Sequence, residues 1–391
     1  MALSYKKFQG MLVSHQRTQL GMAIDTRKMT VSVPLSYLDQ VRLLIRSHWH
    51  IHRKRFTVNE AAVLCGKVGH MAEVVPAIYH LLTHMFTSIA AALNKNKKYL
   101  ALTSKTFREA MKEAARPIES ENDLKQVSFA IGKVAKGQHR SKLQHNILPT
   151  LREELTLLHD ILDDPTVTWS CPIAHLVPRQ PDAEAAGDSS LRAAGGWSTD
   201  LGFWWHLEWP DEVVKRTKLF LPDKKSGKFI SINLLEYATV IINYAASLVA
   251  YTSGHTSINP DTVPFPVLLN WCDNKASIKW TNVMCTANQA GRSLGRLFCA
   301  LLLDNPLGIN CDYIRTTDNT IADDISRLKK SNDGIYNYSS LLQDFPQLQD
   351  CKIFQPSKEL ISIVVQSLLN GTSPPLHAVR SMKPSHLGRL L

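Results

Sequence analysis

The chain has 391 residues, of which 44% are hydrophobic and 20% are charged, and this composition excludes an intrinsically disordered protein. A chain of this length is expected to form two or three domains and not one core. The formal net charge of +11 favours a polyanionic partner, with nucleic acid first and an acidic membrane surface second. A basic but otherwise ordinary soluble surface is the alternative explanation of the charge.

The seven cysteines are scattered along the chain without a C-x-x-C pair. This spacing is typical of buried thiols in a reducing compartment. No apolar run reaches the ~18 residues of a transmembrane helix, and the first residues lack the apolar core of a signal peptide. We therefore expect a cytoplasmic or nuclear protein with no membrane partner.

Residues 1–34 are expected to end in a β-hairpin. Two β-rich runs, 20–24 and 29–33, flank four turn-forming residues, and Pro34 closes the second run.

Residues 35–168 are predicted to form an all-helical module. From Leu35 onward the apolar residues recur at helix spacing. Thr57 and Glu60 stand in the positions of a capping box, in which two side chains satisfy backbone N–H groups at a helix start. The pattern predicts five or six helices.

The C-terminal half has a different pattern. Residues 169–182 are rich in proline and small residues, and we interpret them as a linker. Residues 183–330 show three strands, a helix, a strand, two helices, a strand and a final helix. This order predicts an α/β fold with a mixed sheet flanked by helices. Residues 331–391 are weakly patterned and are expected to form an extension with one helix at 357–369.

Four acidic residues of this half stand beside apolar or small-residue runs that we expect to be buried: Asp188, Glu236, Asp273 and Asp323. A lone ionised carboxylate is costly to bury, so four converging carboxylates predict a cage for cations. Two divalent cations about 4 Å apart can clamp the attacking and the leaving oxygen of a phosphodiester.

Taken one at a time, the four acids have ordinary explanations as well. Asp188 suits a turn or cap, and Asp323 suits the first turn of a helix, where an acid is favourable. Glu236 shares the apolar stripe of the helix 232–251, where a glutamate is uncommon unless it is paired or binds a metal. Asp273 ends a strand, and ligands gather at the carboxyl ends of strands in open sheets. The specific feature is the order of the four acids along the chain, together with the strands and helices on which they lie.

Residues 182–330 resemble the ribonuclease H domain of retrotransposon reverse transcriptases. The matching segments are Gly187-Asp188-Ser189-Ser190 with Gly195-Gly196-Trp197, Ile232-Asn233-Leu234-Leu235-Glu236, Cys272-Asp273-Asn274, and Asn319-x-x-Ala322-Asp323-x-x-Ser326-Arg327. The resemblance implies a five-stranded mixed sheet flanked by helices. It also implies that Asp188, Glu236, Asp273 and Asp323 are the catalytic metal ligands.

A second resemblance lies nearer the N-terminus. Leu20-Gly21-x-x-Ile24-Asp25-x-x-x-Met29-Thr30, followed by Leu64-Cys65-Gly66-Lys67-Val68-Gly69-His70, is similar to the region after the polymerase active site in the same elements. The resemblance implies an end-of-palm hairpin in 1–34 and a thumb and connection module in 35–168. Because no paired-Asp motif precedes residue 20, we expect the downstream portion of a longer polyprotein, without polymerase chemistry.

The activity that the resemblance implies is hydrolysis of the RNA strand of RNA–DNA hybrids with two Mg²⁺ ions, or with Mn²⁺ in their place. One ion would orient and activate water, and the other would stabilise the leaving 3′ oxygen. Many ribonucleases H also carry a histidine before the last acid, and residues 274–322 contain none.

Two other functions stay open from the sequence. One is a catalytically inactive, nucleic-acid-binding remnant of a retroelement, and the other is a structural module that docks a polymerase subunit or a polyprotein neighbour. Contacts to phosphates are expected from exposed cations. The candidates are Arg53, Lys54, Arg55, Lys275, Lys279 and Arg292, and a solvated basic face is the alternative for them.

Overall fold

The structure is a computed structural model, in which two compact units are distinguished. It describes residues 16–19, 21–218, 229–259, 262–283, 286, 288–303, 305–330, 333–334, 336–372, 379–380 and 382–391. The helical unit comprises Ser36–Glu73 and Leu81–Asp164, and the sheet unit comprises Met1–Leu35, Val74–His80 and Pro165–Leu391. The expected N-terminal helical region and the mixed α/β region are both present.

The helical unit contains helices and one short pair of strands. The helices are α2 (Leu35–His48), α3 (Val58–Ala72), α4 (Thr83–Thr103), α5 (Lys105–Ala114), α6 (Glu121–Arg140) and α7 (Pro149–Asp163), and the strands are β4 (Arg55–Phe56) and β5 (His145–Asn146). The predicted capping box at the start of α3 is confirmed, because Thr57 and Glu60 each accept a hydrogen bond from the backbone N–H of the other.

A small antiparallel sheet contains the predicted hairpin. Its strands are β1 (Gln16–Gln19), β2 (Met22–Asp25), β3 (Thr30–Ser32) and β6 (Ser170–Pro172), in that order. The Asp25 carboxylate accepts hydrogen bonds from the backbone N–H groups of Arg27 and Lys28 and so closes the turn. Because β6 pairs with β3 and is followed by η2 (Ile173–His175), residues 169–182 are not a free linker.

The main sheet has seven strands in the order β11-β10-β7-β8-β9-β12-β13. They are β7 (Ala183–Ser189), β8 (Ala193–Ser198), β9 (Phe203–Glu208), β10 (Val267–Cys272), β11 (Gly308–Tyr313), β12 (Lys352–Pro356) and β13 (Gly388–Leu390). The expectation of five strands covers only the strands between 183 and 330. Residues 331–391 extend the same sheet, and they escaped prediction because β12 and β13 are too short to show alternation.

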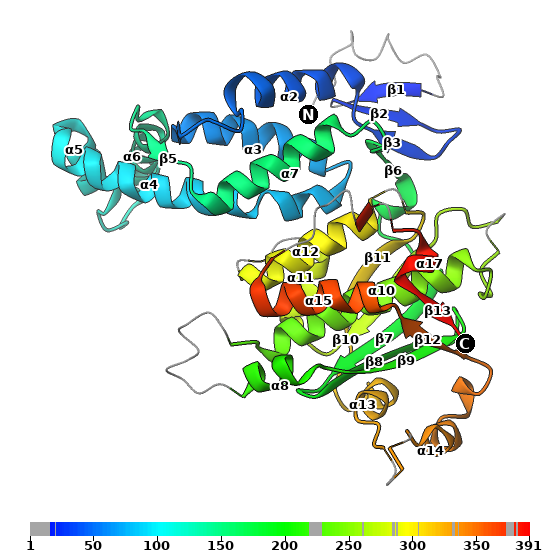
Figure 1. Ribbon diagram of the computed structural model, residues 1–391. Coiled ribbons are helices and arrows are strands. Elements are labelled where there is room, and N and C mark those ends of the chain that lie inside the picture. The colour runs from blue at the N-terminus through cyan, green and yellow to red at the C-terminus, as the bar shows by residue number, and fades with distance from the viewer. Residues whose placement is uncertain are drawn as a thin grey trace. The chain divides into compact units, whose positions relative to one another are not determined.

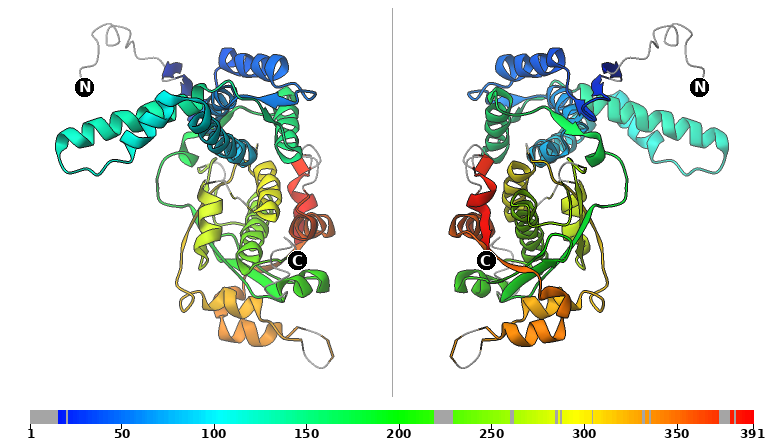
Figure 2. Two further views of the ribbon diagram at one scale, coloured as in Figure 1. Left: turned by 90° about the vertical axis from the view of Figure 1, so that its left-hand side faces the viewer. Right: turned by 90° about the vertical axis from the view of Figure 1, so that its right-hand side faces the viewer.

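Helices cover both faces of this sheet (Figures 1 and 2). The sheet unit contains η1 (Pro76–Leu81), α8 (Asp211–Thr217), α10 (Ile232–Thr252), α11 (Lys275–Val283), α12 (Gln289–Leu302), α13 (Thr320–Ser326), α14 (Tyr338–Asp344), η3 (Pro346–Leu348), α15 (Lys358–Asn370) and α17 (Pro384–Leu387). α10, α12 and α15 lie on one face, and α13 and α14 lie on the other. The helix expected at 357–369 is α15.

Two adjacent glycines allow helices to approach β8 closely from both sides. A Cβ atom at Gly195 would lie 2.4 Å from the Ile325 side chain of α13. A Cβ atom at Gly196 would lie 2.5 Å from the Asn243 side chain of α10. Larger residues here would push one helix or the other away from the sheet, so this glycine pair sets the positions of α10 and α13.

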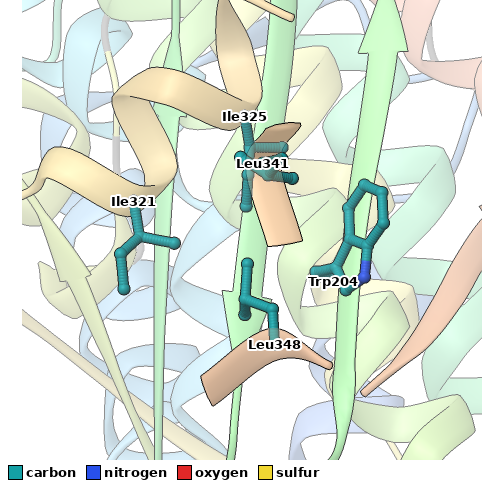
Figure 3. Close-up of a cluster of buried hydrophobic side chains, with 5 residues drawn as sticks. All are labelled: Trp204, Ile321, Ile325, Leu341 and Leu348. Atoms are coloured by element: carbon teal, nitrogen blue, oxygen red, sulfur yellow. The ribbon is translucent and has the colours of Figure 1, made fainter. Parts of the chain in front are cut away.

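An apolar cluster holds α13 on its face of the sheet (Figure 3). Ile321 and Ile325 of α13 pack with Trp204 of β9, and Leu341 and Leu348 complete the cluster. Each of these side chains is buried. Burying a side chain of this size contributes roughly 1.5–3 kcal/mol, so α13 and the acid that it carries have a defined place.

The long helix α10 is a core helix. In the described part of the chain it alone is long and apolar enough to cross a membrane, yet 89% of its most apolar window is buried inside the protein. A buried polar chain also ties it to the sheet, because Asn243 accepts from the Trp205 indole N–H (2.9 Å) and donates to Asn270 (2.7 Å). α10 therefore belongs to the globular core.

Candidate metal centre

Two of the predicted acids lie at the same end of neighbouring strands. β7 and β10 run parallel, with Leu268 level with Ala183 and Trp271 level with Ala186. Carrying this register two residues further places Asp273 level with Asp188. Parallel strands bring their carboxyl ends to one edge, which is where ligands bind in open sheets.

The other two acids come from helices on opposite faces of the sheet. Glu236 lies in the second turn of α10, and its Oε1 accepts a hydrogen bond from the Ser189 N–H at 3.2 Å. Asp323 lies in the first turn of α13, whose C-terminal Ser326 hydroxyl donates to Asp188 Oδ2 at 2.8 Å. Each helix is thus linked by a hydrogen bond to the end of β7.

The four carboxylates lie near enough to influence one another electrostatically. Burial raises the pKa of Glu236 well above its usual value, and the charges of Asp188 and Asp273 raise it further. Burial also raises the pKa of Asp188, which the Ser326 hydrogen bond partly offsets. For Asp323, burial raises the pKa while the Arg327 charge lowers it. Burial is the largest cause for all three acids, and the charges of neighbouring carboxylates act in the same direction.

Short polar side chains orient the carboxylates. The Thr316 hydroxyl, just beyond β11, donates to Asp273 Oδ2 at 2.8 Å. The Ser326 hydroxyl orients Asp188 in the same way and also lies 2.9 Å from the Asp323 carbonyl oxygen. Hydrogen bonds of this kind fix the direction in which a ligand oxygen points.

The tightest group of potential ligand atoms contains a thiol. Among the described residues, one group of His, Cys, Asp or Glu side chains has its ligand atoms within 4.8 Å of one another, and it consists of Glu236, Cys272 and Asp273. Asp188 and Asp323 belong to the same electrostatic cluster but lie outside this group. Carboxylate oxygens suit Mg²⁺ and Mn²⁺, so the four acids fit the predicted cations.

One positive charge already lies in the cluster. The Arg327 guanidinium is 2.6 Å from Asp323 Oδ1, one helical turn away. This ion pair neutralises part of the charge of the cluster. Neighbouring Asp324 is exposed, as its angular offset on the helix predicts.

The predicted phosphate-binding cations have different surroundings. Lys54 and Arg55 are exposed in the helical unit, whereas Arg53 stacks 4.7 Å from the Trp49 ring centre and pairs with Glu60 at 2.6 Å. These contacts hold the Arg53 side chain against its own unit, and its contact to phosphate stays a prediction.

In the sheet unit, Lys275 and Lys279 are exposed on α11, which begins two residues after Asp273. Arg292 is half-buried on α12. Phosphate contact by Lys275, Lys279 and Arg292 stays a prediction, and the two lysines are the more accessible of the three.

An open basic groove adjoins the acidic cluster and was not anticipated. Its volume is about 930 Å³. The basic residues that line it are Arg192, Lys218, Arg327, Lys329 and Lys330, and the acidic ones are Glu208 and Asp211. Ser326 and Arg327 belong both to the groove and to the cluster. Arg192 lies in the turn between β7 and β8, Lys218 directly follows α8, and the other three basic residues follow α13. The groove therefore joins segments that are far apart in the chain. Ser326 and Arg327 were signalled in part by their spacing after Asp323.

Comparison of the chain with protein-family models, with curated proteins and with solved structures found no match.

Proposed function

We propose that the sheet unit is a metal-dependent ribonuclease H that hydrolyses the RNA strand of RNA–DNA hybrids. The observation that carries the proposal is that register and hydrogen bonds bring four carboxylates, from β7, α10, the end of β10 and α13, to the carboxyl ends of β7 and β10. The five strands between 183 and 330, with helices on both faces, agree with the fold that the resemblance implies. The basic groove beside the cluster favours a polyanionic substrate.

The residues of the chain would hold the cations and the substrate in place. Paired divalent cations, when bound, supply an activated water and stabilise the leaving oxygen. Asp188 and Asp273, from adjacent strands, would be the central ligands, with Glu236 and Asp323 on either side. Ser326 and Thr316 keep two of these carboxylates oriented. Recognition of the hybrid would depend on groove shape and 2′-hydroxyls and not on base sequence.

The direct test replaces the carboxylate of Asp188 by an amide in the full chain. With a labelled RNA–DNA hybrid and Mg²⁺, Asp188→Asn should lower the cleavage rate by about 100-fold or more, since loss even of a group that only supports a metal ligand weakens a site by about 10–100-fold. Asp324→Asn, at the exposed neighbour of Asp323, is the matched control and should cleave normally. Equal cleavage by Asp188→Asn and wild-type protein would overturn the assignment.

A second function has one specific observation in its favour. The Arg327–Asp323 ion pair occupies a carboxylate that the nuclease needs as a ligand. A chain in which this arginine takes the place of a cation would bind nucleic acid without cleaving it. Salt-sensitive hybrid binding without Mg²⁺-dependent cleavage in the wild-type protein would favour this alternative.

A further inference from the structure

Cys272 occupies a position inside the acidic cluster that the proposed nuclease does not use. It is the last residue of β10, directly before Asp273, and none of its surface is exposed. Its Sγ lies 4.0 Å from Glu236 Oε2. The ligand atoms of Cys272, Glu236 and Asp273 all lie within 4.8 Å of one another.

Core packing explains part of this arrangement but not all of it. Cys272 contacts Val240 and Cys311 in a small apolar cluster, as a buried thiol commonly does. Its sulfur also accepts the Asn274 backbone N–H at 3.4 Å, so the sulfur is the acceptor of a polar contact at the strand end. Sulfur therefore faces the carboxylates of the site as well as the apolar core.

The separation of the sulfur and the carboxylate oxygen is close to that of two ligands on one cation. A Zn–S bond is about 2.3 Å long and a Zn–O bond about 2.1 Å, so a tetrahedral ion holds the two atoms about 3.6 Å apart. The observed distance between the sulfur and the carboxylate oxygen is 4.0 Å, and a small rotation of either side chain would close the difference. Sulfur ligands select Zn²⁺ and similar cations, whereas Mg²⁺ prefers oxygen.

We propose that Cys272 is a ligand donor of the acidic cluster, and that it makes the cation position next to Glu236 select Zn²⁺ or Co²⁺ over Mg²⁺. Binding releases the thiol proton to solvent, and the thiolate, Glu236 and Asp273 bind the ion together. This inference deepens the proposed metal centre and rests on it. Zn²⁺ should consequently compete with Mg²⁺ for one of the two cation positions.

The test uses Co²⁺ alone as the probe, because a cobalt–thiolate bond has a sulfur-to-metal charge-transfer absorption that oxygen ligands lack. The full-length wild-type protein, titrated with Co²⁺, should develop this band with one equivalent of ion. Cys272→Ser should lose the band and bind Co²⁺ about 10-fold or more weakly. Cys351→Ser, a matched control at a half-buried thiol of the same unit, should keep both.

Two results would overturn the inference. One is the absence of a charge-transfer band in the wild-type protein, which needs no variant and so does not depend on the folding of Cys272→Ser. The other is a band that persists in Cys272→Ser. Mg²⁺-dependent hybrid cleavage is measured on the same wild-type sample. A protein that cleaves but lacks the band refutes the role of Cys272 alone, and a protein with the band but no cleavage refutes the proposed nuclease alone.

Discussion

Two buried glutamates, one in each unit, have opposite surroundings. Glu154 of α7 is buried and accepts the backbone N–H groups of His84 and Met85 at 2.8–3.1 Å. These groups belong to the first turn of α4, which has no side-chain cap of its own. Glu236 of α10 is equally buried, but apart from one backbone N–H and the Cys272 thiol it faces other carboxylates.

The difference separates a structural acid from an acid that awaits a cation. A helix start offers unsatisfied N–H groups and a favourable dipole, so the charge of Glu154 is neutralised within the protein. The charged neighbours of Glu236 are themselves negative, so a proton or a bound cation is needed to neutralise its charge. Burial alone does not distinguish the two; the partners do.

Removing the charge of Glu154 should change the free energy of unfolding more than removing the charge of Glu236. Glu154→Gln places an amide NH₂ against the N–H donors of α4, and we expect the free energy of unfolding to fall by about 3 kcal/mol. Urea denaturation of Glu154→Gln and of Glu153→Gln, at the exposed neighbour, provides the comparison. Equal stability of the two variants would show that Glu154 does not cap α4.

His80 is a buried histidine of the sheet unit, and its burial should make the stability of the protein depend on pH. Burial lowers the pKa of His80 to about 3. The unfolded chain takes up this proton near pH 6.5 and the native protein does not, so stability is lost as the pH falls from 6.5 towards 3. Between pH 7 and pH 5 this histidine should lower the free energy of unfolding by about 2 kcal/mol.

His80→Gln should remove that part of the pH dependence. The measurement is the free energy of unfolding of the variant and of the wild-type protein, each at pH 7 and at pH 5. His386→Gln, at an exposed histidine of the same unit, is the control for the substitution itself. Parallel pH curves for wild type and His80→Gln would contradict the neutral, buried state of His80.

Removing the charge of Glu236 should raise the free energy of unfolding, whereas removing the charge of Glu154 should lower it. Without divalent cations, Glu236→Gln relieves the burial of a charge among like charges and should raise the free energy of unfolding by about 1 kcal/mol. Added Mg²⁺ should stabilise the wild-type protein more than the variant, because a ligand stabilises only the state that binds it. Thermal melts with EDTA and with Mg²⁺ measure both effects. A destabilised variant in EDTA would mean that Glu236 is satisfied within the protein, as Glu154 is.

The smallest effect concerns the basic groove. Arg192 is exposed on its wall, and Arg192→Gln should weaken hybrid binding a few-fold and lower the slope of log affinity against log salt by about 1. Lys125→Gln is the control, because Lys125 is equally exposed but pairs with Glu121 on α6 of the helical unit. An unchanged slope for Arg192→Gln would place the nucleic acid elsewhere.

The sequence alone was sufficient for the local structure and for the list of acids. Periodicity predicts β7, β8 and β9, the helix α10 and its neighbours, because each is long enough to repeat its pattern. Composition and order singled out Asp188, Glu236, Asp273 and Asp323, since a carboxylate in an apolar run is rare enough to be noticed.

Only the tertiary structure decided which groups surround each acid. The addition of β12 and β13 to the sheet, the ion pair of Arg327, the basic groove and the approach of Cys272 to Glu236 all join residues far apart in the chain. Glu154 shows the same limit, because its partners lie 69 and 70 residues away and leave no local pattern. Short-range periodicity reports burial, whereas the electrostatic partner of a buried charge is set by packing between distant segments.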